Sequence, residues 1–407
     1  SHTLFRGSAI MFIGTTIVNA GNYLFHLLMG RMLGPSGYGI LESIISSMYI
    51  LSIVPLALNL AIVKFVSSAK GKDKEEEISA FYYWSRQKVI IFGFVAAVFL
   101  VLLLPFWLKF LQLNDFRLLL FSVLAFPFSL LLLVVRSFFT GVLDFISYSF
   151  STIIEVVLKI ILTVLFVAAG WSVLGVVVGL FVSGIITYLF SVRLLKFQKN
   201  GQQQDFSQTK ELIIYALPAM LAVFSFYSLF STDIILVKHF FSSFEAGIYA
   251  SLSVLGKIIF FASSSFVSVM FPLISQRHAQ GERYRHLFWL TLIIVAISSI
   301  CISALYYFFP KLMIEILFGS KYLSGANLLF LFGIFLSLYS ISNVVINFFL
   351  SIGKTKVVVI SLAAALLQIF LITLWHNNLT TVINDSIVTT FILLVSLLLY
   401  YPYATKK

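Results

Sequence analysis

Long apolar segments recur along the whole chain and constrain its fold more than any other feature. A bilayer core of about 30 Å is crossed by roughly 20 apolar helical residues. Because backbone polar groups in lipid must be satisfied internally, segments of this length predict an all-α polytopic membrane protein. We predict twelve transmembrane helices, at about residues 7–29, 39–63, 87–108, 117–138, 148–169, 171–192, 212–234, 247–271, 287–309, 325–349, 357–376 and 385–403.

Composition excludes a water-soluble fold. Hydrophobic residues make up 60% of the chain and charged residues only 10%, against about 25% charged residues in soluble domains. Mean hydropathy is +1.06. The net charge of +12 therefore does not indicate a nucleic-acid partner; we expect it to face anionic lipid headgroups of the bilayer.

Lysine and arginine are distributed unevenly between the two sides. Of 27 such residues, 19 fall on one side of the twelve predicted segments, 6 on the other, and two lie within segments. Positive loops are retained in the cytoplasm, so we expect a multi-pass protein of the cell inner membrane with both termini cytoplasmic. The first segment passes directly into a second and is interpreted as a true span rather than a cleaved signal. The chain begins at Ser1 without a methionine, so we expect the natural start to lie upstream.

The two halves of the sequence resemble each other at an offset of about 208–210 residues. Gly39-Ile40 opens the second predicted segment and Gly247-Ile248 opens the eighth. Six crossings in each half would make these parallel repeats. We predict an N-terminal six-helix bundle at 1–200 and a C-terminal one at 201–407; the alternative is a chance alignment of apolar sequence.

The turn between the first two segments carries a family resemblance. Leu33-Gly34-Pro35 and Tyr38-Gly39, together with the joint Phe138–Ser149, resemble the polysaccharide-exporter branch of the multidrug/oligosaccharidyl-lipid/polysaccharide (MOP) superfamily, which includes Wzx-type flippases. The resemblance implies two pseudo-symmetric six-helix bundles around a central cavity. It also implies transport of a lipid-linked oligosaccharide, with polysaccharide polymerase machinery as a candidate partner.

Two lysines lie near the middle of apolar segments, Lys159 in the fifth and Lys257 in the eighth. A lysine at that depth costs about 2.5–3.5 kcal/mol unless it meets water or a partner. We interpret both as contacts for an anionic headgroup such as pyrophosphate. The alternatives are structural: Glu155 precedes Lys159 by one helical turn, and Lys257 could pair with an acid on another helix.

Other polar residues in the segments allow two interpretations each. Arg31 and Lys238, at outer ends, are candidate interfacial anchors or substrate contacts on the exit side. Asn19 and Asn22 share a helix face and could bind sugar or join helices. Arg136, at a cytoplasmic end, is a candidate anchor or headgroup contact.

Buried carboxylates are the candidates for ion coupling. Glu155, Glu42 and Asp233 lie within or at the ends of apolar segments. A carboxylate removed from water can take up a proton and carry it, so we expect a proton or sodium gradient to drive the protein. The alternative is simple charge pairing with Lys159, Arg31 and Lys238, respectively.

Motifs for enzymatic chemistry are missing from the sequence. It contains no Gly-rich loop ending in Lys-Ser/Thr and no His-Glu-x-x-His, so we expect a transporter with no cofactor and no metal site. The leading hypothesis is a flippase that moves polyprenyl-pyrophosphate-linked oligosaccharides, such as O-antigen or capsule precursors, by alternating access. Alternatives are a multidrug or organic-cation antiporter, a polysaccharide ligase or polymerase, and a nonenzymatic scaffold.

Overall fold

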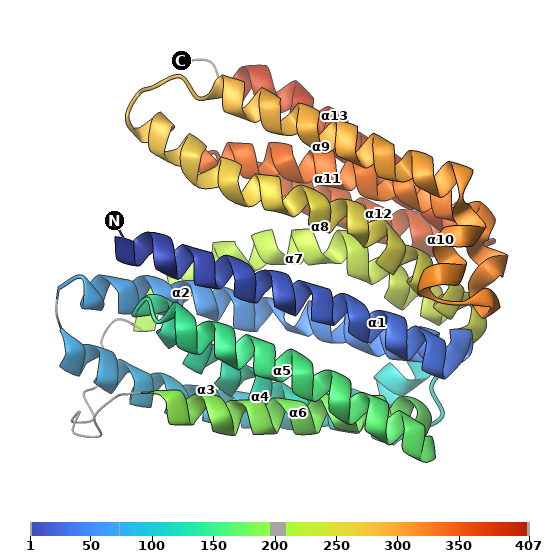
Figure 1. Cartoon of the computed structure of the whole chain (residues 1–407), viewed down its shortest axis with the longest axis horizontal. Coiled ribbons are helices and arrows are strands. Elements are labelled where there is room, and N and C mark those ends of the chain that lie inside the picture. Colours follow the sequence, from blue (N-terminus) through green and yellow to red (C-terminus); the bar gives the residue numbers. More distant parts are fainter. Residues whose placement is uncertain (1, 73, 196–208, 405–407) are drawn as a thin grey trace. The chain divides into compact units, whose positions relative to one another are not determined.

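The computed structural model describes residues 2–72, 74–195 and 209–404, and helices dominate them (Figure 1). The elements in chain order are α1 (His2–Leu51), α2 (Ile53–Lys70), α3 (Glu75–Phe110), α4 (Phe116–Gly141), α5 (Phe145–Phe166), the π-helical turn η1 (Val167–Trp171), α6 (Ser172–Leu194), α7 (Thr209–Phe240), α8 (Ser243–Ala279), α9 (Arg285–Phe308), α10 (Pro310–Leu317), the 3-10 turn η2 (Ser320–Leu328), α11 (Leu329–Ser351), α12 (Val357–Leu374) and α13 (Leu379–Ala404).

Twelve long helical stretches run through these described residues, which confirms the predicted all-α polytopic fold. α1 contributes two of them because its helix is interrupted at Gly34, where φ is 68°; the second part of α1 continues into α2. By length and composition alone, eight stretches of the described residues qualify as membrane spans. One of these is the 50-residue stretch Phe145–Leu194, which holds both α5 and α6 and turns at Gly170 (φ 91°), as predicted.

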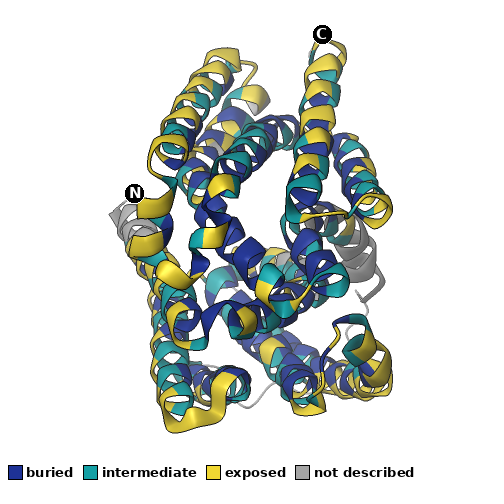
Figure 2. Cartoon of the chain, turned by 90° about the vertical axis from the view of Figure 1, so that its right-hand side faces the viewer, coloured by how far each residue is buried: buried dark blue, intermediate teal, exposed yellow. Residues whose placement is uncertain are grey.

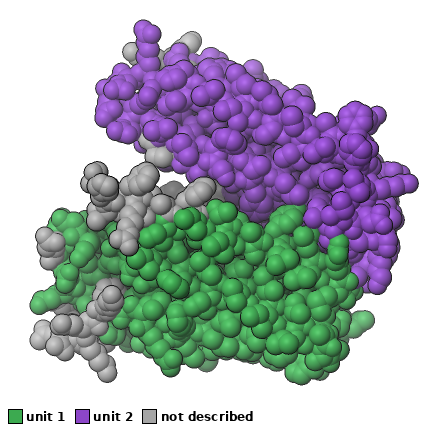
Figure 3. All heavy atoms as spheres, viewed as in Figure 1, with its two compact units in different colours: residues 1–33, 51–223 green, residues 34–50, 224–407 purple. Residues whose placement is uncertain are grey.

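Packing divides the chain into two compact units (Figure 3). Unit 1 comprises Ser1–Leu33 and Leu51–Val223, and unit 2 comprises Gly34–Ile50 and Phe224–Lys407. The second part of α1 therefore belongs with the C-terminal helices, although its neighbours in sequence on both sides belong to unit 1. The predicted bundles, 1–200 and 201–407, place this segment with the N-terminal half and remain a prediction.

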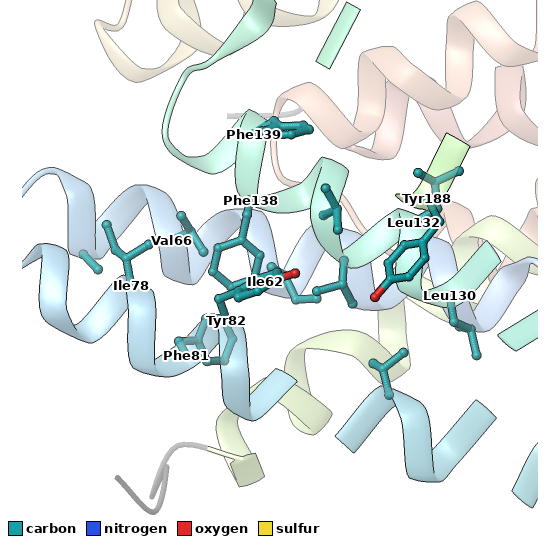
Figure 4. Close-up of a cluster of buried hydrophobic side chains, with 14 of the residues drawn as sticks. Ile62, Val66, Ile78, Phe81, Tyr82, Leu130, Leu132, Phe138, Phe139 and Tyr188 are labelled. Atoms are coloured by element: carbon teal, nitrogen blue, oxygen red, sulfur yellow. The ribbon is translucent and has the colours of Figure 1, made fainter. Parts of the chain in front are cut away.

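α4 is the central helix of unit 1. It packs against α2, α3, α5 and α6, and half of its most apolar window is buried. Apolar side chains from α2, α3, α4 and α6 form the core around it (Figure 4), including Ile62, Val66, Ile78, Phe81, Leu130, Phe138 and Tyr188. Arg136, one of the charged side chains described below, projects from this central helix.

α11 has the same role in unit 2, where it packs against α8, α9 and α13. Residues 34–50 lie tightly against α8, because a Cβ added at Gly39 would collide with the Ser243 carbonyl and one at Gly247 with the Pro35 carbonyl. Only glycine permits this approach of two backbones. The glycines that open the second and eighth predicted segments thus meet each other.

Backbone turns support the internal repeat. A hydrogen bond from an N–H to the carbonyl five residues earlier closes a helix end, and such bonds recur at matching places in the two halves. Their sequence numbers differ by 208 and by 210, as the predicted offset requires. The matched bonds are Lys74 N to Ala69 O (3.1 Å) with Glu282 N to Arg277 O (2.9 Å), and Asp144 N to Phe139 O (2.8 Å) with Lys354 N to Phe349 O (2.9 Å).

Exposed residues lie along the outer faces of several helices (Figure 2), and many of them are large and apolar. Leu102 of α3 and Leu399 of α13 are each 73% exposed, and Phe94 of α3 is 69% exposed. In water such faces would drive aggregation, whereas lipid solvates them. The exposed apolar surface thus agrees with a multi-pass membrane protein.

Candidate functional site

In unit 1, α1 and α5 lie side by side and run in the same direction (Figure 1). Gly14 touches Ser149, and seven residues further along both helices Gly21 touches Val156. Seven residues make about two helical turns, so the same faces remain in contact. Because the two helices run in parallel in this register, Asn22 of α1 and Lys159 of α5 lie at about the same height.

The ammonium of Lys159 is held by α1. It donates a hydrogen bond to Asn22 Oδ1 and lies 4.6 Å from the centroid of the Phe25 ring, a cation–π contact. The structure therefore brings together two predicted site residues, Lys159 and Asn22. The amide and the ring are neutral groups, and the lysine also interacts electrostatically with Glu155, one helical turn before it.

Glu155 forms an ion pair with Arg136 of α4 and also interacts electrostatically with Lys159 on its own helix. Arg136 Nη1 lies 2.7 Å from Glu155 Oε2, and its Nε and Nη2 donate to Ser151 Oγ and O, each at 2.9 Å. Ser151 Oγ is 2.7 Å from Ser191 Oγ of α6. We call Asn22, Arg136, Glu155 and Lys159 the unit 1 cluster; two cations and one carboxylate give it a formal charge of +1.

A second group of charges, the unit 2 cluster, consists of Glu42, Asp233 and Lys257 from α1, α7 and α8. Glu42 is 2% exposed and Asp233 is 0% exposed. The Lys257 ammonium interacts electrostatically with both carboxylates and lies 5.1 Å from the Phe230 ring centroid. With both acids ionised, the formal charge of this cluster is −1.

Asp233 has further hydrogen bonds that fix its position. Tyr249 Oη donates to Asp233 Oδ2 at 2.8 Å, and the Ile234 N–H donates to Oδ1 at 2.9 Å. Tyr249 also interacts electrostatically with Asp385 of α13. Among the described residues, no hydrogen-bond partner reaches the buried Asp385 Oδ2, so an acceptor oxygen is available close to the unit 2 cluster.

The remaining predicted residues lie outside both clusters. Asn19 and Arg31 are exposed residues of α1. Lys238 is only 1% exposed, whereas an interfacial anchor would extend its ammonium into water. Of the pair Asn19 and Asn22, Asn22 forms a hydrogen bond between two helices, α1 and α5, which is the interhelical contact given above as one interpretation.

Sequence reasoning missed several residues of these sites. Tyr249 carries no signal in a single sequence, because tyrosine is common at helix contacts. Asp385 could have been found, since it is a carboxylate beside an apolar segment, but it lies at a predicted segment boundary. Among the described residues, no group of three or more His, Cys, Asp or Glu side chains is arranged to hold a metal ion.

Comparisons with known proteins identify related sequences and folds. The sequence model of the family described as polysaccharide biosynthesis protein matches residues 4–278. No curated protein sequence matches the chain. An inward-facing multidrug transporter of the MATE family, in the MOP superfamily, is a similar solved structure, with 13% identity, TM-score 0.78 and 95% of each chain covered.

Two further solved structures share the fold. The lipid II flippase MurJ, in an inward closed conformation, has 15% identity and TM-score 0.76, covering 97% of this chain and 87% of its own. A MOP superfamily transporter from Pyrococcus furiosus, described as having a binding pocket of reversed polarity, has 15% identity and TM-score 0.65, with 100% and 96% covered. At these identities the likeness establishes the fold, which is that of MOP transporters.

Proposed function

The chain belongs to the polysaccharide biosynthesis protein family, and on this premise we propose that it is a flippase for polyprenyl-pyrophosphate-linked oligosaccharides. It would move such precursors of O-antigen, capsule or a related polysaccharide from the inner to the outer leaflet of the cell inner membrane. Both termini would lie in the cytoplasm, and a polysaccharide polymerase would take the product. The protein acts in this proposal as a transporter and forms no covalent intermediate.

The formal charge of +1 in the unit 1 cluster is the observation that carries this proposal. A pyrophosphate headgroup needs cationic donors to replace water in the apolar region. Lys159 supplies one of the two positive charges; its ammonium contacts Asn22 and Phe25 and interacts electrostatically with Glu155. Arg136 adds a guanidinium on the neighbouring helix, although each of its three nitrogens already donates one hydrogen bond, to Glu155 or to Ser151.

Breaks in α1 and after it support alternating access. The chain passes from unit 1 to unit 2 between residues 33 and 34, and returns between 50 and 51. Gly34 has φ 68° at the first passage, and Ser52 separates α1 from α2 just after the second. We propose that residues 34–50 move with unit 2 and that these two breaks absorb the rocking of the units.

Acids of the unit 2 cluster are the proposed route of ion coupling. Uptake of a proton or a sodium ion by Asp233 or Glu42 would change the cluster charge from −1 to 0 and free Lys257 to meet an anion. Asp385 would join this relay through Tyr249. A proton or sodium gradient should then change the transport rate severalfold. Asp233→Asn should abolish this response to the gradient. Lys88→Gln is the control, because it alters an exposed lysine of α3 and should leave the response unchanged.

The direct test is transport by the purified protein in vesicles. A fluorescent polyprenyl-pyrophosphate disaccharide is added, and its appearance in the opposite leaflet is followed with a membrane-impermeant quencher. We expect a rate at least tenfold above that of protein-free vesicles. A rate equal to that of protein-free vesicles, from protein that remains monodisperse, would contradict the proposal.

Organic-cation antiport is the second candidate, favoured by one observation: two carboxylates outnumber the lysine in the unit 2 cluster. A cationic cargo would bind to Glu42 and Asp233. The discriminating measurement is uptake of a fluorescent organic cation into the same vesicles under a proton gradient. Cation uptake without flipping of the lipid would favour the antiporter.

A further inference from the structure

Basic side chains gather in unit 2 where α8 ends and α9 begins (Figure 1). We call residues 277–286 the α8–α9 corner; its three arginines and one glutamate give a formal charge of +2, with both histidines neutral. Arg277 is half-buried. Its Nη1 donates to the Arg283 carbonyl oxygen (3.4 Å) and, with His286 neutral, to His286 Nε2 (3.2 Å). These contacts join the end of α8 to the start of α9 and keep the basic residues of both segments close together.

The matching corner in unit 1 has a different charge pattern. At the 208-residue offset of the matched hydrogen bonds, residues 69–78 correspond to the α8–α9 corner. They contain three lysines, one aspartate and three glutamates, a formal charge of −1. Ion pairs neutralise two of the lysines there, Lys70 with Glu75 and Lys74 with Glu77.

Arginines replace both of these glutamates in unit 2. At the same offset, Arg283 takes the position of Glu75 and Arg285 that of Glu77. Among the described residues, no carboxylate forms an ion pair with Arg277 or Arg283. The charge of the α8–α9 corner is therefore not balanced by the acids around it.

The start of α9 is an unfavourable place for these cations. A helix N-terminus has unpaired N–H groups and a partial positive charge, so acids stabilise it and bases destabilise it. α3 begins with three glutamates in its first turn, whereas α9 begins with Arg285 and His286 and has no acid there. No side chain of the described residues caps α9. The fold does not need the arginines at this corner, and a bound anion would relieve their repulsion.

An exposed apolar stripe continues from the basic residues along α9. Its side chains are 45–57% exposed and are Trp289, Leu290, Ile293 and Ile297. Trp289 lies four residues after Arg285, and the other three lie four, seven and eleven residues after His286, so helical spacing puts them on one face with these basic residues. Arg285–Phe308 is long and apolar enough to cross a membrane. The basic residues thus lie at the membrane surface and the stripe extends into the hydrocarbon.

We propose that the α8–α9 corner binds the headgroup of an anionic phospholipid. The arginines donate hydrogen bonds to the phosphate oxygens, and one acyl chain lies along the apolar stripe. Charge at the surface followed by an apolar chain toward the middle of the bilayer is the order found in a phospholipid. A zwitterionic headgroup fits less well, because its positive group would meet the arginines. This site is separate from the unit 1 cluster and does not depend on the cargo.

Photo-crosslinking tests the site. p-Benzoylphenylalanine replaces Leu290 in one variant and Ile91 of α3 in another. The two side chains are 55% and 54% exposed and lie about one helical turn into predicted segments that start near residues 287 and 87. Each variant is reconstituted in phosphatidylcholine with a trace of radiolabelled phosphatidylglycerol or, separately, of radiolabelled phosphatidylcholine. We expect at least fivefold more phosphatidylglycerol label at position 290 than at 91, and equal phosphatidylcholine label at both.

Charge variants show whether the arginines cause this preference. Arg283→Gln/Arg285→Gln, added to the position-290 variant, should lower its phosphatidylglycerol label to the level at position 91. Lys70→Gln/Lys74→Gln is the matched control, because it removes two cations from the corresponding corner of unit 1, and it should leave the label unchanged. The proposal would be overturned by equal phosphatidylglycerol label at the two positions, by the same preference for phosphatidylcholine, or by an unchanged label in the arginine variant.

Competition separates a membrane phospholipid from a transported lipid. Unlabelled undecaprenyl-pyrophosphate disaccharide, equimolar with the phosphatidylglycerol, should leave the label at position 290 unchanged. Displacement of the label would make the corner a cargo site and would also overturn the proposal. Full phosphatidylglycerol labelling of a protein that fails to flip the disaccharide lipid would support the corner and contradict only the proposed function, so the two failures are distinguishable.

Discussion

Lys159 in unit 1 and Lys257 in unit 2 are both lysines within long apolar helices, but their charges are balanced differently. Lys159 contacts an asparagine and a phenylalanine ring and interacts with one carboxylate, Glu155, which is also paired with Arg136. Lys257 interacts with two buried carboxylates from other helices. The difference suggests a division of roles, with unit 1 presenting positive charge to an anion and unit 2 exchanging cations.

The internal repeat supports this distinction. Within the predicted offset of about 208–210 residues, Gln368 of α12 lies at the level of Lys159 of α5, and its Nε2 donates to the Leu229 carbonyl of α7 at 3.1 Å. A neutral amide thus makes the link between the first and fifth helices of unit 2. Because the fold does not need a lysine for that link, the charge of Lys159 calls for a functional explanation.

The largest effect is expected at Lys257. Replacement by Gln leaves Glu42 and Asp233 buried without their cation, which should cost about 3–5 kcal/mol of folding stability and reduce transport at least a hundredfold. Thermal unfolding in detergent and the vesicle assay would measure both. Adding Asp233→Asn should restore part of the stability, since Glu42 remains without its cation, and should not restore transport; no recovery of stability would contradict the pairing of Lys257 with Asp233.

Lys159→Gln sharpens the comparison, because it copies the residue found in unit 2. The variant retains an amide donor for Asn22, so its folding stability should stay within about 1 kcal/mol of the wild type. Transport should fall at least tenfold, because the unit 1 cluster loses its net charge. Wild-type transport by this variant would show that the lysine has a packing role only.

The close packing of residues 34–50 against α8 should depend on the absence of a side chain at Gly247. Gly247→Ala places a methyl group against the Pro35 carbonyl and should destabilise the protein by about 1–3 kcal/mol. Gly184→Ala is the matched control, because nothing lies within 4 Å of its added Cβ; helix propensity should make it neutral or stabilising by up to about 1 kcal/mol. Equal unfolding temperatures for the two variants would contradict the close approach.

The smallest effect is expected for a charge pair outside the membrane. Hydrogen bonds from the Arg117 side chain, partly offset by desolvation, lower the pKa of Asp115 below its usual 3.8. A lowered folded-state pKa stabilises the protein above the unfolded-state value, and this contribution is lost as pH falls through the folded-state pKa. Asp115→Asn should therefore reduce the unfolding temperature slightly at pH 7 and not at all well below pH 3.8. If Asp115→Asn lowered the unfolding temperature more than Lys257→Gln does, the comparison of buried and exposed charges would be contradicted.

Much of the fold could be predicted because segment length and hydropathy are set by the bilayer. The twelve crossings and the turn at Gly170 followed from apolar length and glycine position alone. The placement of residues 34–50 with unit 2 did not, because hydropathy shows that a segment spans and not which helices it packs against. That placement depends on the meeting of Gly39 and Gly247, which are far apart in sequence.

Part of the candidate site could be predicted for a similar reason. An ionisable residue in an apolar segment stands out, so Lys159, Glu155 and Lys257 were identifiable. Not all of their partners were: helical spacing indicates Lys159 as a partner of Glu155, and the two do interact electrostatically, but the ion pair with the Arg136 guanidinium of α4 was not expected. Spacing describes one helix, whereas the ion pair depends on which neighbouring helix is within reach.

The polarity of ligand binding tests the central claim most directly. Equilibrium binding of an undecaprenyl-pyrophosphate disaccharide and of a lipophilic organic cation would be measured by native mass spectrometry, on the wild type and on Lys159→Gln. We predict that the anionic lipid binds the wild type, that Lys159→Gln weakens it at least tenfold, and that the cation does not displace it. Tight binding of the cation, with anionic lipid binding unchanged by Lys159→Gln, would contradict the account.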